Sequence, residues 1–81
     1  MESRSNRNVE ALGIVQTTFV VSGSLRYRSV INNQAYMHLL AEAQRTYDDP
    51  IDIRDITWTV GKGNPFTNNY EYTAIGTAVR K

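Results

Sequence analysis

Apolar side chains in the first third of the chain follow the pattern of a β-strand. From Ala11 to Val21 the sequence is rich in β-branched and aromatic residues and contains no proline, a composition typical of strands. Both faces of this predicted strand carry apolar side chains. Ser22-Gly23-Ser24 is a turn signal. Residues 25–29 fit either a short hairpin partner or an ordered loop.

The middle of the chain has the periodicity of an amphipathic helix. The apolar stripe recurs every three or four residues and consists of Tyr36, Leu39, Leu40, Ala43 and Tyr47. Either Asn32 or Asn33 can cap the start of the helix, because an asparagine side-chain oxygen accepts a backbone N–H. The segment Asp48-Asp49-Pro50 ends the helix, since the residue before a proline is driven out of the helical region. We predict a helix of about four turns.

Two further strands are predicted after the helix. Apolar residues at positions 51 and 53 alternate in one phase, whereas those at 56, 58 and 60 alternate in the opposite phase. Both sets share one face only if an extra residue is inserted, so we predict a β-bulge at Arg54 or Asp55. A loop over residues 61–69 leads into the last strand, from Tyr70 to Val79.

The predicted fold class is α+β, with a single helix packed on a three-stranded, mainly antiparallel sheet in the order β-α-β-β. A fourth strand is added if residues 25–29 pair with the sheet. The length of 81 residues suits one domain. We assign residues 9–81 to this domain and expect the polar residues 1–8 to be a disordered leader.

Charge and composition exclude several classes of function. Nine Lys and Arg against eight Asp and Glu give a net charge of +1, too little to attract nucleic acid or an anionic membrane. No apolar run approaches the roughly 20 residues that a membrane-spanning helix needs. The absence of cysteine excludes disulfides and thiolate nucleophiles, and it leaves the redox compartment open. We therefore predict no nucleic-acid partner, no membrane span and no cofactor.

A cluster of carboxylates is the candidate metal site. Its members are Asp48, Asp49, Asp52 and Asp55, and clustered carboxylates can bind a hard cation such as calcium. The alternative interpretation is that the first two decorate the helix end while the other two face solvent. Arg45 and Arg54 are then the expected ion-pair partners of these carboxylates.

Three further features suggest chemistry only weakly. A catalytic His38 would need a nucleophile and an orienting acid, and no Ser or Thr lies in a nucleophile-elbow context, so we predict a surface or rim histidine, no catalytic residue and no enzyme. Arg26-Tyr27-Arg28 interleaves basic and aromatic residues as some single-strand binders do, but in a nearly neutral domain cross-strand pairing is the simpler explanation. Gly61-Lys62-Gly63 lacks the spacing of a phosphate-binding loop and is predicted to be a turn.

Several segments together resemble a known family. They are Leu12-Gly13-Ile14-Val15, the helix end at residues 40–44, the strand at residues 51–60 and the closing segment at residues 72–79. In these segments the chain resembles YbjQ-type heavy-metal-binding domains and small bacterial envelope and lipoprotein domains. The resemblance implies a compact subunit that forms rings or other homo-oligomers, in a bacterial envelope or periplasm after processing of an exported protein, with the cytoplasm as the alternative. A soft-metal site is not implied by the residues, because the chain has no cysteine and one histidine.

One helix can cover only one face of a three-stranded sheet. The residues expected to face water on the other side, and so to form an interface, are Val15, Phe19, Val21, Tyr70 and Tyr72. Monomers rarely expose such apolar patches, so a second copy is expected to cover it unless residues 22–30 fold back over that face. The sequence thus predicts a non-enzymatic, self-associating structural or interaction domain. The alternative is a module that binds a divalent cation or a small molecule whose identity the sequence leaves open.

Overall fold

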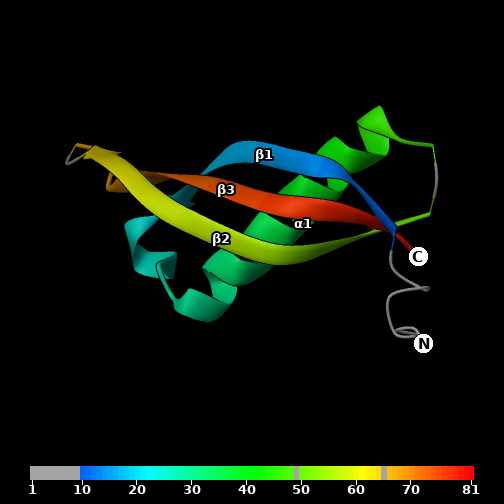
Figure 1. Cartoon of the computed structure of the whole chain (residues 1–81). Helices are drawn as coiled ribbons and strands as arrows, with labels where there is room; N and C mark the ends of the chain where they lie inside the picture. Colours follow the sequence, from blue (N-terminus) through cyan, green and yellow to red (C-terminus); the bar gives the residue numbers. More distant parts are fainter. Residues whose placement is uncertain (1–9, 49, 65) are drawn as a thin grey trace.

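The predicted β-α-β-β fold is present in the computed structural model, which describes residues 10–48, 50–64 and 66–81. Its elements are strand β1 (Glu10–Ser22), the short 3-10 helix η2 (Gly23–Leu25), helix α1 (Arg28–Thr46), strand β2 (Ile51–Asn64) and strand β3 (Asn69–Arg80). The strands form one antiparallel sheet in the order β1-β3-β2. Figure 1 shows α1 lying across one face of this sheet. The expected leader, residues 1–8, lies outside the described residues.

The core lies between α1 and the sheet, and small residues bring the two layers close together. Ala35 and Ala43 on the helix and Ala74 and Ala78 on β3 are all fully buried. Leu39 fills the centre of this layer and is also fully buried. The central strand presents alanine and glycine to the middle of the helix, while its Tyr72, which is 1% exposed, is one of the two largest fully buried side chains of the core.

Helix α1 begins earlier than the sequence predicted. Its first residue is Arg28, and Tyr27 occupies the cap position without a side-chain capping hydrogen bond. The two asparagines proposed as caps lie inside the helix. Asn32 instead accepts a hydrogen bond from the Trp58 indole of β2, with Trp58 Nε1 2.6 Å from Asn32 Oδ1. The extra turn brings Ile31, which is 3% exposed, onto the buried stripe.

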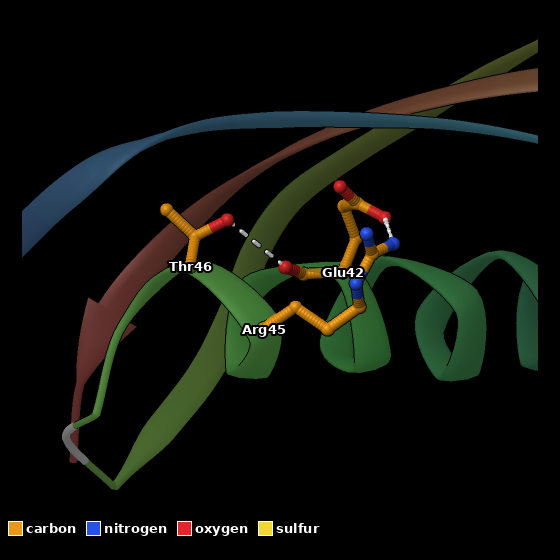
Figure 2. A network of polar contacts seen from close by, with 3 residues as sticks. All are labelled: Glu42, Arg45 and Thr46. Carbon is orange, nitrogen blue, oxygen red and sulfur yellow. Dashed lines mark hydrogen bonds and ion pairs between the residues drawn. The ribbon is translucent and has the colours of Figure 1, made fainter.

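The end of α1 agrees with the prediction. The helix stops at Thr46, and the backbone N–H of Tyr47 donates to the carbonyl of Ala43 over 2.8 Å. In Figure 2 the Thr46 hydroxyl donates to the backbone carbonyl of Glu42, and the Arg45 guanidinium contacts the Glu42 carboxylate at 3.0 Å. We predicted that Arg45 would pair with the aspartates. It is paired instead with Glu42 of its own helix. The pair is exposed, so it stabilises the helix by only about 0.2–0.5 kcal/mol.

The predicted β-bulge is confirmed in β2. The pairing of β2 with β3 shifts register between Arg54 and Thr57, and Asp55 has a φ of 56°. Aspartate tolerates this left-handed backbone better than most residues. The bulge lets Ile53 and Ile56 both face α1, because the inserted residue corrects the phase of the strand.

The hairpin between β2 and β3 is tighter than the predicted nine-residue loop. Gly61-Lys62-Gly63 is not a turn but continues β2, which pairs with β3 as far as Asn64 and Asn69. A second register shift, between Val60 and Gly63, accommodates this extension. The Tyr70 ring lies against Gly63, where a Cβ atom would come within 2.6 Å of the ring, so glycine leaves room for the aromatic side chain.

Candidate association surface

The sheet face opposite α1 is not crossed by any described element, and we call it the open face. Cross-strand partners point to the same side of a sheet, so the pairing register identifies its members. They are Ile14, Gln16, Thr18 and Val20 of β1, Glu71, Thr73, Ile75 and Thr77 of β3, and Arg54, Thr57 and Thr59 of β2. Threonine is the most frequent residue on this face, which is therefore mostly polar.

Three large apolar side chains interrupt the threonines of the open face. Ile14 is 69%, Val20 62% and Ile75 40% exposed. Scattered exposed apolar residues are normal on proteins, and here three lie on one sheet face. Ile14 and Ile75 are in adjacent cross-strand rows, and Val20 is two rows beyond Ile75. This arrangement can bind another surface by packing.

The five residues predicted to form the interface are not on this face. Val15, Phe19, Val21 and Tyr72 are at most 7% exposed and pack under α1, and Tyr70 is half-buried against the same core. The predicted exposure of these five residues at an interface is therefore wrong. The helix covers Val15, Phe19 and Val21 of β1, because burying this set lowers the free energy of folding most. Ile14 and Val20 are left exposed to solvent.

Residues 22–30 do not close over the open face either. They form η2 and the first turn of α1, and the backbone N–H of Gly23 donates to the carbonyl of Asn68 in the hairpin over 2.6 Å. This contact fixes the segment at the end of the sheet, next to the turn between β2 and β3. The loop alternative for covering the second face is therefore wrong.

A hollow of about 620 Å³ lies beside the open face near the hairpin turn. Its lining includes Val20, Lys62, Phe66, Asn69, Tyr70 and Glu71. Phe66, at the turn, is 97% exposed. An exposed aromatic side chain therefore lies beside the hollow at this end of the open face.

Sequence reasoning missed a contact network around Arg26. The Arg26 guanidinium carbon lies 3.9 Å from the centre of the Tyr70 ring, and Arg26 Nε donates to the Tyr72 hydroxyl over 2.7 Å. The hydrogen bond to Tyr72 is the main reason that the pKa of Arg26 is raised. The predicted cross-strand pairing of Arg26-Tyr27-Arg28 is wrong, because no strand contains these residues. The partners of Arg26 lie more than 40 residues away, so the motif contains no sign of the cation–π contact.

His38 is exposed, as predicted, and its ring stacks on Phe19 of β1. The two ring centres are 5.3 Å apart and nearly parallel. Phe19 in turn stacks on Tyr72, and Trp58 meets Tyr72 edge to face. His38 is thus the last ring in a row of four rings, followed by Phe19, Tyr72 and Trp58. Packing against Phe19 is sufficient to explain the position of the His38 ring.

The aspartate cluster is spread over several environments. Among residues 10–48, 50–64 and 66–81, no three His, Asp or Glu side chains gather closely enough to hold a metal ion. Asp48 and Asp55 are exposed, while Asp49 lies outside the described residues. Asp52 accepts a hydrogen bond from the Tyr36 hydroxyl of α1 over 2.8 Å and another from the backbone N–H of Ile53 over 2.9 Å.

This hydrogen bond predicts how stability depends on pH. The Tyr36 hydroxyl is the main cause of the lowered pKa of Asp52, followed by the Ile53 N–H, and the charges of Lys81 and Arg54 add smaller contributions. The same bond to Asp52 is the main cause of the raised pKa of Tyr36. Stabilisation of about 1 kcal/mol is therefore complete between pH ~4 and ~10, the ordinary values for Asp and Tyr. It is lost as the pH falls through the folded-state pKa of Asp52 or rises through that of Tyr36.

Tyr36→Phe tests this dependence in urea unfolding curves measured from pH 2 to 11. We expect the variant to be about 1 kcal/mol less stable at pH 7 and to lose less stability than the parent at both extremes. Asp48→Asn, which removes an exposed carboxylate at the helix end, is the control and should leave the profile nearly unchanged. An acid limb in Tyr36→Phe as steep as that of the parent would contradict the assignment.

No helix among the described residues combines the length and apolar character needed to cross a membrane. A comparison of the chain with family models, curated proteins and solved structures gives no match. The resemblance to YbjQ-type domains therefore stays a prediction.

Proposed function

We propose that this chain is a non-enzymatic interaction domain that associates with itself through the open face. The observation that carries the proposal is the exposure of Ile14, Val20 and Ile75 on one side of the sheet, where no described element covers them. Covering these side chains with a second copy removes apolar surface from water.

The chemistry of the open face supports a binding role over a catalytic one. Its polar members are mostly threonines, with Gln16, Glu71 and Arg54 at separate positions. Threonine and β-branched side chains form a regular surface suited to sheet packing. General acid–base catalysis instead needs a paired acid and base within hydrogen-bonding reach of a substrate.

Sedimentation equilibrium and light scattering test self-association directly. We expect the average mass to rise above the 9.2 kDa of one chain as the concentration increases into the hundreds of micromolar. Val20→Thr should shift this rise to higher concentration, because it removes apolar contact while keeping a β-branched shape. Met37→Thr is the control, since Met37 is 56% exposed on the helix side. A constant monomer mass at every concentration would refute the proposal.

The proposed cellular location rests only on the resemblance to small bacterial envelope and lipoprotein domains. We propose that the protein acts at a bacterial cell envelope, as the small domains it resembles do. Fractionation of the source cells with an antibody against the domain tests this, and recovery only in the cytoplasmic fraction would contradict it.

A further inference from the structure

We propose that two copies pack their open faces together about a two-fold axis that runs between the sheets at right angles to the strands. In this arrangement β1 of one copy lies antiparallel over β1 of the other. The inference rests on the proposed function and specifies its partner, a second copy of this chain, and the residues that meet.

The apolar residues of β1 fix the position of the axis. Ile14 and Val20 lie on the same face of the same strand, and they are the two most exposed apolar side chains of the open face, at 69% and 62%. A rotation that reverses the strand direction midway between them places Ile14 of each copy over Val20 of the other. A two-fold interface requires this kind of self-complementary surface.

The same rotation brings opposite charges together. Val20 pairs with Glu71 in one cross-strand row, while Thr77 pairs with both Ile14 and Arg54 in a row at the other end of the face. Exchanging these rows places Glu71 of each copy over Thr77 of the other, one strand away from Arg54. The symmetry creates this approach of opposite charges twice, and complementary charges favour one register over others.

The other face-to-face axis, parallel to the strands, is less favourable. It would leave every row facing itself, so that Glu71 on the central strand meets Glu71 of the second copy. It would also place Ile14 over the Arg54 position on β2, across the sheet. Like charges directly opposed destabilise such a contact. Pairing through the edge of β1 would leave the open face uncovered.

The size of the open face sets the strength of the dimer. Three strands about 4.8 Å apart and seven residues of about 3.4 Å each give a face of roughly 15 by 24 Å. A standard interface buries about 800 Å² on each partner, and this face offers less. We therefore expect a reversible dimer with a dissociation constant in the micromolar range or weaker, which sets the concentrations for the test.

Cysteine cross-linking reads out the register directly, because the chain has no cysteine of its own. Ile14→Cys and Val20→Cys are prepared as separate chains, distinguished by a tag, and treated with a short bismaleimide reagent. We expect efficient cross-linking in the equimolar mixture and little in either variant alone, since residue 14 meets residue 20 and not itself. Ile75→Cys on the central strand, which meets itself only if the axis is parallel to the strands, is the matched control.

Each outcome separates this register from the proposed function. Cross-linking of Ile14→Cys or Ile75→Cys to itself, faster than in the mixture, overturns the register. Absence of cross-linking in the mixture also overturns it when sedimentation shows a dimer. A chain that stays monomeric in sedimentation refutes the proposed function itself, and the register with it.

A charge exchange provides an independent test. At low ionic strength, Arg54→Glu and Glu71→Arg are each expected to weaken dimerisation about fivefold or more, because two pairs per dimer become repulsive. The double variant R54E/E71R should recover most of the parental affinity. Arg45→Glu, on the helix side, is the control and should change little. A double variant no stronger than the single variants overturns the proposed pairing.

Discussion

Replacing Leu39 by alanine is expected to lower the free energy of unfolding by about 2–5 kcal/mol, the range for buried leucines. Leu39 is fully buried at the centre of the helix–sheet layer. Its Cδ1 atom lies 3.2 Å from the position that a Cβ atom on Gly76 would occupy. The truncation leaves a cavity that neighbouring alanines cannot fill, because their side chains are short and the backbone is held by the sheet.

Thermal and urea unfolding measure the loss. An 81-residue domain has about 4–12 kcal/mol of stability in total, so the variant should unfold at least about 10 °C below the parent. Met37→Ala, an exposed substitution on the same helix, should stay within about 0.5 kcal/mol of the parent. A loss below about 1 kcal/mol in Leu39→Ala would contradict the central position of this side chain.

The sequence predicts the layout of the fold because alternation and helical periodicity report local backbone geometry. The bulge beside Asp55 follows from a change of phase between residues 53 and 56, which is visible without any tertiary information. The start of α1 is different. The Asn32 side chain is well suited to capping a helix, but Asn32 lies inside α1, where its side-chain oxygen accepts a hydrogen bond from the Trp58 indole. Such a tertiary partner overrides local preference and leaves no local signal.

The candidate site is harder to predict than the fold, because it depends on which face the helix selects. In β1, the residues that point to one face and those that point to the other both include apolar side chains. Choosing the wrong set as buried therefore exchanges the buried face of the sheet with the exposed face. Counting does not decide between the two sets, because Val15, Phe19 and Val21 are matched by Leu12, Ile14 and Val20. The register shift between Ala11 and Gly13 brings Leu12 to the core side, and nothing in the alternation predicts that shift. The contacts of Arg26 with two tyrosines of β3 depend on chain folding over more than 40 residues, and no pattern in the sequence contains them.

Gly76→Val is expected to destabilise the protein by about 1–3 kcal/mol, the usual cost of overpacking a core, although valine favours strands. Gly76 is buried on β3 beneath α1. A Cβ atom there would lie 2.8 Å from Ile53 Cγ2, 3.2 Å from Leu39 Cδ1 and 3.4 Å from Ile56 Cγ1. Valine must therefore push α1 or β2 away from the central strand.

The matched control is Thr77→Val, the next residue of β3, which points to the open face. It introduces the same side chain without contact with α1, so its stability in urea unfolding should stay within about 0.5 kcal/mol of the parent. The Leu39 side chain occupies the space next to Gly76 that a valine side chain would need, and Leu39→Ala empties that space. The double variant L39A/G76V should therefore lose less stability than the sum of the two single losses. We expect this coupling to reach about 1 kcal/mol, as residues in contact show. Additive losses would mean that the Leu39 side chain does not occupy the space above Gly76.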